Sequence, residues 1–258
     1  MVKIIMNGFL GTMGNVICTL AETNPNCEIV AGIDTNEHPT VEPFPTFTDI
    51  NECDMPADVI IDFSTASAVP SLLGYAVKRK TPIVLCTTGL NDDILEKISE
   101  ASQQIAIFKS YNMSLGVNLV SEVVRRISST LYNAGFDIEI IEKHHNQKID
   151  APSGTAIMLA NSINSSLDNK LDHVYDRSIV TTKREREQIG IHSLRGGSIV
   201  GEHSVIFAGK DEDIEIRHTA NSKEIFAIGA IKAAMFLKEK PAGLYNMENL
   251  MSEFISKD

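Results

Sequence analysis

The sequence predicts an α/β protein with a Rossmann-like, doubly wound parallel sheet and an inserted α+β domain whose sheet is mixed or antiparallel. Two observations support this fold class. In the N-terminal part of the chain, short apolar runs alternate with helical patterns, which is typical of parallel strands joined by right-handed crossovers. Later, three apolar runs (188–194, 203–208 and 213–218) follow one another through turns that contain glycine, without helices between them. Alternating apolar and polar residues in the last run favour a sheet with one packed face.

Composition limits the kind of protein. The chain has 258 residues, of which 43% are hydrophobic and 22% charged, as in a globular protein of one large or two moderate domains. A net charge of -11 argues against nucleic acid as a partner. We expect no membrane partner, because the chain lacks an apolar run of about 18 residues. The absence of a signal peptide and of C-x-x-C spacing among the four cysteines predicts a reduced, cytoplasmic protein.

The N-terminal stretch has the pattern of a dinucleotide-binding unit. An apolar run at 2–6 leads into a glycine turn at 8–14, a helical pattern follows, and a second apolar run at 28–33 ends at Asp34. Such a turn lets backbone N–H groups approach a pyrophosphate, and the acid binds the ribose hydroxyls. The predicted contacts of this segment are Gly8, Phe9, Leu10, Gly11, Thr12, Met13, Gly14 and Asp34.

The glycine spacing is not the standard one. Leu10 occupies the second glycine position of the G-x-G-x-x-G fingerprint, so the chain reads G-x-x-G-x-x-G. Glycine turns connect many strands and helices, and the turn alone is therefore weak support. Asp34 strengthens it, because this acid lies 20 residues after Gly14, close to the spacing of about 20 that the motif requires.

Polar turns follow three more predicted strands, at 58–63, 82–86 and 105–108. In a parallel sheet these turns meet at the carboxyl edge, where ligands bind. The alternative is that they are ordinary loops. The expected cofactor contacts in the second and third turns are Cys86, Thr87, Thr88, Ser110, Tyr111, Asn112 and Met113.

Helical patterns divide the chain into domains. We expect helices at 66–79, at 92–103 with Ile94, Leu95 and Ile98 inward, at 114–131, and at 224–238. The last helix should return to the first domain. The prediction is a dinucleotide-binding domain of residues 1–113 and 221–258, and a substrate-binding domain of residues 114–220, to which the family resemblance described below adds a role in oligomerisation.

Two further expectations concern that second domain. The helix at 114–131 is expected to bury one face, formed by Leu119, Val123, Ile127 and Leu131. Residues 168–187 are polar and include a Lys-Arg-Glu-Arg-Glu run, and they are predicted to form a solvated loop or flap.

The stretch 142–155 holds the candidate catalytic residues. His144, His145 and Lys148 are expected just past a strand at 137–141. Histidine is the side chain most easily poised to transfer a proton near neutral pH, and lysine adds positive charge. Such a group is also compatible with a plain polar loop. A metal site is disfavoured, because zinc needs three or four nitrogen, sulfur or carboxylate ligands.

The same stretch ends in a predicted anion-binding site. Ser153, Gly154 and Thr155 precede an apolar helical pattern, and first-turn N–H groups have no partner within their helix. The positive end of the helix dipole favours a carboxylate or phosphate there. Gly154 lets a ligand approach the backbone closely. The stretch therefore predicts a small anionic substrate beside a histidine that can protonate it.

These residues resemble the 4-hydroxy-tetrahydrodipicolinate reductase family over nearly the whole chain. Residues 142–155, Glu-Lys-His-His-Asn-Gln-Lys-Ile-Asp-Ala-Pro-Ser-Gly-Thr, carry the most specific part of the resemblance. Supporting segments are 8–14, 87–89, 112–118, 191–197, 201–203 and 222–229. The G-x-x-G-x-x-G spacing is this family's own variant. The resemblance implies an NAD(P)H-dependent reduction of a cyclic dicarboxylic imine in lysine and diaminopimelate biosynthesis.

The resemblance also implies residue roles. His144 would donate the proton, His145 would contact the substrate, and Lys148 would be a second acid or a charge partner. Gly154 and Thr155 would hold a carboxylate of the small dicarboxylate substrate. Which of His144 and Lys148 delivers the proton stays open, because their titrations are coupled. A homotetramer, assembled through the sheet of the second domain, is likewise implied only by the resemblance.

Cofactor choice follows from departures from the family pattern. Many relatives carry arginine after the second glycine, where this chain has Thr12, and several have a basic residue after the ribose acid, where this chain has Thr35 and Asn36. Asp34 without a nearby arginine should repel a 2'-phosphate. We therefore expect NADH to be preferred, with NADPH as the alternative cofactor.

Two other functions compete with this one. A dehydrogenase of the same two-domain plan that acts on a semialdehyde or a polyol would keep the glycine turn. A non-catalytic dinucleotide sensor would keep it too. Neither explains the His-His-x-x-Lys pattern next to Ser-Gly-Thr.

Overall fold

The computed structural model describes residues 1–36, 43–110, 112–179 and 181–255. The chain forms two compact units, and the first combines Met1–Ser114 with Glu224–Asp258. The second unit, Leu115–Lys223, is an insertion in the first. Within the described ranges, no helix is both long and apolar enough to cross a membrane.

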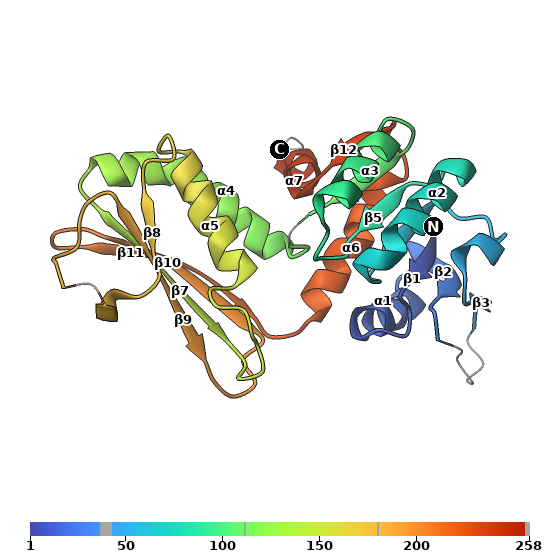
Figure 1. The fold of residues 1–258 in the computed structure, drawn as a ribbon, viewed down its shortest axis with the longest axis horizontal. Coiled ribbons are helices and arrows are strands. Elements are labelled where there is room, and N and C mark those ends of the chain that lie inside the picture. The colour runs from blue at the N-terminus through green and yellow to red at the C-terminus, as the bar shows by residue number, and fades with distance from the viewer. Residues whose placement is uncertain (37–42, 111, 180, 256–258) are drawn as a thin grey trace. The chain divides into compact units, whose positions relative to one another are not determined.

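The first unit is a parallel sheet between two helical layers (Figure 1). Its strands are β1 (Val2–Asn7), β2 (Cys27–Ile33), β3 (Thr46–Phe47), β4 (Val59–Asp62), β5 (Ile83–Leu85), β6 (Ala106–Lys109) and β12 (Gly243–Tyr245). Its helices are α1 (Thr12–Glu22), α2 (Val69–Arg79), α3 (Asp92–Ser102), α6 (Glu224–Leu237) and α7 (Met247–Ile255), with short 3-10 turns η1 (Ile50–Glu52) and η2 (Ala66–Ala68). The strand order is β12-β6-β5-β4-β1-β2-β3, and every pairing is parallel. Because the order reverses at β1, a ligand crevice is expected outside the carboxyl end of that strand.

Buried apolar side chains on both faces hold this sheet. On one face, Ile60 and Ile83 pack with Leu72 of α2 and Ile98 of α3 in one cluster. On the other face, α6 packs against α1 and contacts β1, β4, β5 and β6. Leu95 was expected to face inward in α3, but it is 38% exposed; its neighbours Ile94 and Ile98 carry the buried face of that helix.

The second unit is a mixed sheet covered by two helices. Its strands are β7 (Asp137–His144), β8 (Asp172–Val174), β9 (Gln188–Arg195), β10 (Gly201–Ala208) and β11 (Asp213–Ala220), and its helices are α4 (Leu115–Asn133), α5 (Gly154–Ser165) and the 3-10 turn η3 (Arg177–Ile179). The order is β11-β10-β7-β9-β8. β10 runs antiparallel to β7 and β11, and β9 runs parallel to β7 and β8. The two units confirm the predicted fold class.

Two predictions for the second unit were only partly right. Of the predicted buried face of α4, Ile127 and Leu131 pack against the core, whereas Leu119 and Val123 are exposed. The fully buried residues of this helix are Val117, Val124, Ser128 and Tyr132. The buried face is set by the side of the helix that meets α5 and the sheet, and this side does not follow the most apolar positions. Most described residues of the segment 168–187 are exposed, as predicted, but the segment also contains the short elements β8 and η3. Its Arg184 is half-buried and pairs with Asp137 and Glu139 at 2.6 and 2.9 Å.

Close packing explains two glycines of the first turn. Gly8 has a φ of 82°, a backbone conformation that side chains rarely adopt, and a Cβ there would lie 2.7 Å from the Phe63 carbonyl oxygen. A Cβ on Gly14, in α1, would lie 2.1 Å from the Gly8 carbonyl oxygen. The two glycines therefore bring the first turn of α1 against the end of β1, which positions the glycine turn at the carboxyl edge of the sheet.

We predict that Gly14→Ala lowers the free energy of unfolding by about 2 kcal/mol or more, because a rigid backbone atom blocks the added methyl group. Urea unfolding followed by circular dichroism measures this change. The control is Gly74→Ala in α2, where a Cβ would meet nothing within 4 Å. That variant should be more stable by roughly 0.5–1 kcal/mol, since alanine is the better helix former. Equal effects at the two positions would contradict the packing explanation.

Candidate active site

The end of β7 carries the centre of the site. Residues two apart on a strand share a face, and Ile138, Ile140, Glu142 and His144 alternate with less buried neighbours. The first two pack in the apolar core of the second unit. Glu142 and His144 continue the same buried face, and Glu142 is 0% exposed. β7 extends three residues beyond the predicted strand, so that His144 is its last residue and does not lie in the following loop.

Glu142 binds several partners at once. Its two oxygens accept hydrogen bonds from Nη1 and Nη2 of Arg195, each at 2.7 Å. Its Oε2 lies 2.6 Å from His144 Nδ1, and its Oε1 accepts the backbone N–H of Ser153 at 3.1 Å. Burial by itself would raise the pKa of Glu142, but the hydrogen bonds from Arg195, Ser193 and His144 outweigh it and lower the pKa to about 2. Glu142 is therefore ionised at neutral pH.

An ionised Glu142 determines how His144 can act. A carboxylate only accepts hydrogen bonds, so Nδ1 of His144 carries a proton and donates it to Oε2. Nε2 is then the ring nitrogen that can gain and release a proton. A Cβ at Gly201 would lie 3.2 Å from Nε2, so the glycine leaves room beside that atom. Burial lowers the pKa of His144, against the pull of Glu142, and the charges of Lys148 and Arg195 lower it further.

A short loop places Lys148 after β7. Lys148 Nζ binds Asp150 Oδ1 at 2.7 Å. The loop is held to the turn after β9, because Gly196 N–H donates to the His144 carbonyl at 3.0 Å and Arg195 donates to the Asp150 carbonyl at 2.7 Å. His145 is half-buried in the same loop, and its carbonyl accepts the Lys148 N–H at 3.2 Å. These contacts place the ammonium group of Lys148 on a restrained loop.

The helix α5 begins where the sequence predicts an anion site. Ser153 is the N-cap, and its Oγ accepts the Ala156 N–H at 3.2 Å. Gly154 is exposed, with nothing within 4 Å of a Cβ added there, and Thr155 is half-buried. An exposed first turn combines free space with the positive end of the helix dipole. The second unit thus brings His144, the loop with Lys148 and the exposed N-terminus of α5 to the end of β7.

The first unit places most of the predicted cofactor residues at the carboxyl edge of its sheet. Leu10 N–H donates to Asp34 Oδ2 at 3.3 Å, which links the glycine turn to the acid after β2. Gly11 is the N-cap of α1, Thr12 is exposed at the start of that helix, and Met13 is half-buried. A glycine turn, an open helix start and an acid fit the pyrophosphate and ribose of a dinucleotide. The Phe9 ring is buried against Phe44, and its N–H donates to the Ile33 carbonyl at 3.3 Å.

The turns after β5 and β6 lie at the same edge. Thr87 is buried and Thr88 is exposed. Cys86 is half-buried, and burial, together with the nearby Asp62 carboxylate, raises the pKa of its thiol well above the ordinary value. After β6, Ser110 Oγ donates to the Asn112 carbonyl at 3.0 Å, and Met113 is buried. Tyr111, the remaining candidate of this turn, lies outside the described residues.

A buried carboxylate at this edge was not predicted. Asp62, the last residue of β4, is 0% exposed and accepts hydrogen bonds from Asn7 Nδ2 at 2.7 Å, Ser64 Oγ at 2.6 Å and Thr87 Oγ1 at 2.5 Å. Burial raises its pKa, and the hydrogen bonds from Ser64, Thr87 and Asn7 oppose that change. The network joins the ends of β1, β4 and β5. An aspartate that ends an apolar strand could have indicated it.

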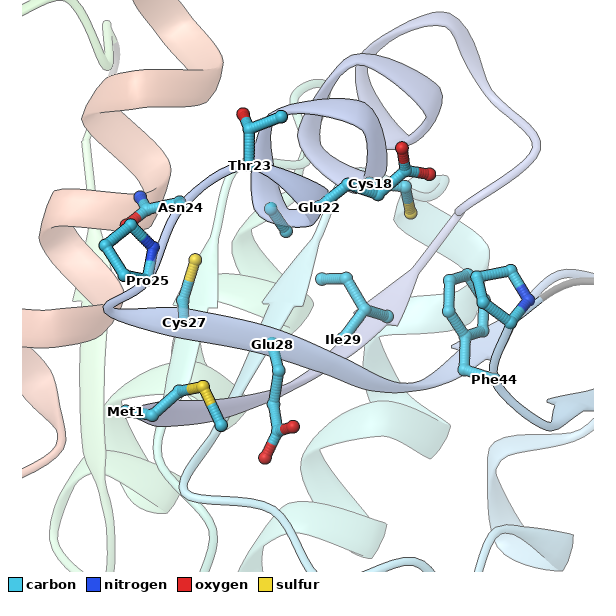
Figure 2. Close-up of a pocket in the computed structure, with 12 residues that line it drawn as sticks. Met1, Cys18, Glu22, Thr23, Asn24, Pro25, Cys27, Glu28, Ile29 and Phe44 are labelled. Carbon is cyan, nitrogen blue, oxygen red and sulfur yellow. The ribbon is translucent and has the colours of Figure 1, made fainter.

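A cavity of about 500 Å³ lies elsewhere in the first unit (Figure 2). Residues from α1, β2 and the segment before β3 line it, and they include Cys18, Glu22, Cys27, Glu28 and Phe44. None of the predicted site residues lines this cavity. The candidate site is defined by the side chains described above.

The fold and the site together define a class, the two-domain pyridine-nucleotide-dependent oxidoreductases. Family models for the N-terminus and the C-terminus of dihydrodipicolinate reductase match residues 2–113 and 116–251. The chain belongs to the dihydrodipicolinate reductase family. It is 50% identical over 98% of its length to the 4-hydroxy-tetrahydrodipicolinate reductase of Caldanaerobacter subterraneus subsp. tengcongensis, 99% of which is covered. It is 49% identical to that of Clostridium tetani, with 98% of each chain covered.

Solved structures agree on the fold. A dipicolinate-bound dihydrodipicolinate reductase from Paenisporosarcina sp. TG-14 matches with a TM-score of 0.80 at 23% identity, over 95% of this chain and 97% of the other. A myo-inositol dehydrogenase from Corynebacterium glutamicum matches with a TM-score of 0.53 at 14% identity, over 99% of this chain and 94% of the other. Both similarities are ones of fold alone. Family membership thus favours the reductase over the polyol or semialdehyde dehydrogenase and over the dinucleotide sensor.

The lowered pKa of Glu142 predicts a dependence of stability on pH. The carboxyl group of Glu142 binds a proton more weakly in the folded protein than in the unfolded chain. Its contribution to the free energy of unfolding is therefore complete above the ordinary pKa of 4.5 and is lost as the pH falls towards about 2. That shift, for a fully buried group, corresponds to about 3 kcal/mol. Glu142→Gln should therefore flatten the loss of unfolding free energy between about pH 5 and about pH 2, measured by urea titration. Glu96→Gln, an exposed position on α3, is the control, and an unchanged slope in Glu142→Gln would contradict the assignment.

Proposed function

We propose that this chain is a 4-hydroxy-tetrahydrodipicolinate reductase, which uses NAD(P)H to reduce a cyclic dicarboxylic imine to tetrahydrodipicolinate in lysine and diaminopimelate biosynthesis. Two curated relatives near 50% identity carry that name. The observation that carries the proposal is the ionised Glu142 that holds His144 beside the N-terminus of α5. The dipicolinate-bound relative supports a small planar dicarboxylate as the ligand. The first unit would bind the dinucleotide, and the second the substrate.

The bound dinucleotide supplies a hydride to the substrate ring. The chain's own residues supply binding, orientation and a proton. We assign proton donation to Nε2 of His144, because Glu142 occupies the other ring nitrogen. The backbone of Gly154 and the side chain and backbone of Thr155 would bind one carboxylate at the start of α5. Lys148 and His145 would contact the substrate from the loop after β7.

The lowered pKa of His144 fits a donor that acquires its proton together with the substrate. Without ligand, burial and the charges of Lys148 and Arg195 favour the neutral ring. A dicarboxylate bound nearby adds negative charge, which favours the protonated form. Lys148 would then compensate one carboxylate while the imidazolium transfers its proton.

Two substitutions separate the roles of His144 and Lys148. His144→Gln should lower kcat by roughly 10²–10⁴-fold, the usual contribution of general acid catalysis. Lys148→Ala should raise KM by roughly ten- to a hundredfold, because a hydrogen bond from a charged group to the substrate is lost. Steady-state oxidation of NADH with the freshly formed aldol product of pyruvate and aspartate semialdehyde measures both. His173→Gln on β8 and the exposed Lys183→Ala are the controls. Unchanged turnover in His144→Gln would remove it as the proton donor.

We propose that NADH is the preferred cofactor. The Asp34 carboxylate accepts hydrogen bonds from Leu10 N–H and, at its other oxygen, from Asn36 N–H. Thr35 and Asn36 add no positive charge beside it. A 2'-phosphate near this carboxylate would meet like charge.

The expected result is a kcat/KM at least tenfold higher with NADH than with NADPH, a difference of about 1.4 kcal/mol. Asp34→Asn keeps the shape of the side chain and removes its charge. The ratio of the two kcat/KM values should therefore fall by about tenfold, because kcat/KM with NADPH rises. Steady-state kinetics with both cofactors measure the ratio. A wild-type kcat/KM tenfold higher with NADPH would overturn the proposal.

We also propose that the chain is a cytoplasmic homotetramer assembled through the sheet of the second unit. The four cysteines are free thiols, as suits a reducing compartment. Helices α4 and α5 pack on the face of the sheet that carries Ile138 and Ile140. The other face carries Ile141, Leu194 and Ile206, together with Lys143 and Arg217, which both pair with Glu202. Apolar residues among paired charges are typical of an interface.

Light scattering should give a mass near four times the 28.3 kDa of one chain. Leu194→Glu, at a position 47% exposed in the single chain, should lower that mass by placing a charge in the interface. Leu119→Glu is the matched control, because Leu119 is 46% exposed but lies on α4. A mass of one chain for the unsubstituted protein, or equal effects of the two variants, would contradict the assembly.

A further inference from the structure

His203 on β10 is a buried histidine to which the proposed reaction gives no role. Its side chain reaches Ser153, and its Nε2 lies 3.0 Å from Ser153 Oγ. The His203 ring also packs edge-on against that of His144, with centroids 5.1 Å apart and an interplanar angle of 72°. His203 is 4% exposed, so it touches both the proton donor and the N-cap of α5 while staying away from solvent.

The hydrogen bond between His203 and Ser153 does not depend on the tautomer. A hydroxyl group has one proton and two lone pairs. Oγ accepts the Ala156 N–H with one lone pair. It can then donate to a bare Nε2 or accept from a protonated one. Burial first, and then the charge of His144, lower the pKa of His203 to about 4, so the ring is neutral at pH 7.

The opposite ring nitrogen shows that this contact is specific. His203 Nδ1 is buried without a hydrogen-bond partner in the part of the chain that the structure describes. Leaving a buried polar atom unpaired is costly. An apolar side chain of similar size would avoid that cost if His203 served only to fill space. The Nε2 contact is therefore the feature that sets this histidine apart from a core residue.

Ser153 is consequently held from two sides. Its N–H is bound by Glu142 Oε1, and its Oγ by His203 Nε2. The same two residues contact His144, Glu142 through Nδ1 and His203 through the ring. The start of α5 and the proton donor therefore share one buried support that spans β7 and β10.

We propose that His203 is a positioning residue that acts through Ser153 and fixes the N-terminus of α5 for a substrate carboxylate in register with His144. The proposal rests on the proposed function, because it takes the ligand of that helix end to be a dicarboxylate. His203 itself touches no reacting atom. Its loss should weaken dicarboxylate binding and leave dinucleotide binding intact, since the cofactor residues belong to the other unit.

A pair of conservative variants tests the contact. His203→Gln places a polar group near the former Nε2, and His203→Asn places one near the former Nδ1, where no partner lies. Calorimetric titration of the full-length protein with pyridine-2,6-dicarboxylate, at saturating NADH and well below the unfolding temperature, gives the dissociation constant. We expect His203→Asn to raise it about tenfold, the effect of one lost hydrogen bond of ordinary strength. His203→Gln should stay within about threefold of the unsubstituted protein.

A double-mutant cycle tests the route through Ser153. Ser153→Ala removes the contact with His203 and also the N-cap bond to Ala156, so it should weaken binding at least as much as His203→Asn. The double variant should be little weaker than Ser153→Ala alone, because the contact between the two residues is already lost in that variant. The Kd for NADH and the unfolding temperature of each variant report damage unrelated to this contact. The control is His173→Gln, which should bind the dicarboxylate normally.

The outcomes separate this inference from the proposed function. An unsubstituted protein that does not bind pyridine-2,6-dicarboxylate would contradict the proposed function and this inference with it. Normal binding in His203→Asn, or additive losses in the double variant, would overturn the inference alone. Weaker dicarboxylate binding in His203→Asn, together with near-normal binding in His203→Gln, supports the inference.

Discussion

The site depends on one buried charge. Glu142 has no contact with solvent, and a carboxylate removed from water is stable only when it is paired and hydrogen-bonded. Arg195 compensates the charge, and the remaining positions on its oxygens hold His144 and the backbone of Ser153. Because the same carboxylate holds His144 and the helix start, their separation does not depend only on the loop between them. A substrate that spans the two would therefore meet a preorganised arrangement.

A second buried carboxylate organises the other unit in a contrasting way. Asp62 accepts hydrogen bonds from the neutral groups of Asn7, Ser64 and Thr87, and burial raises its pKa. The hydrogen bonds and charge of Arg195 have the opposite effect on Glu142. Both acids end or nearly end a strand, and both tie neighbouring segments together at the edge where ligands are expected. In each unit the polar residues at the strand end hold the turns that follow the strands, and the apolar residues before them anchor the strand.

Local sequence patterns predicted an element well where a single interaction determines its structure. Strands buried on both faces consist mostly of apolar residues, and β1 and β4 were therefore predicted within a residue or two. The glycine turn was predictable because a positive φ at Gly8 and the close approach of Gly14 both require glycine. Helix faces were less predictable. In α4 the exposed Leu119 is more apolar than the buried Ser128, whose hydroxyl donates to the Val124 carbonyl at 2.5 Å and so tolerates burial.

The sequence by itself determined the fold class, the glycine turn with its acid, the reductase family and the residues His144, Lys148 and Gly154 as candidates. These features are encoded by neighbours in the chain, through strand and helix periodicity and through a continuous motif. Only the tertiary structure decided which nitrogen of His144 is available, because that depends on Glu142, Arg195 and Ser153. Arg195 lies on a different strand, 53 residues from Glu142. His203 likewise meets Ser153 across 50 residues, and such a contact exists only once β7, β9, β10 and α5 have packed.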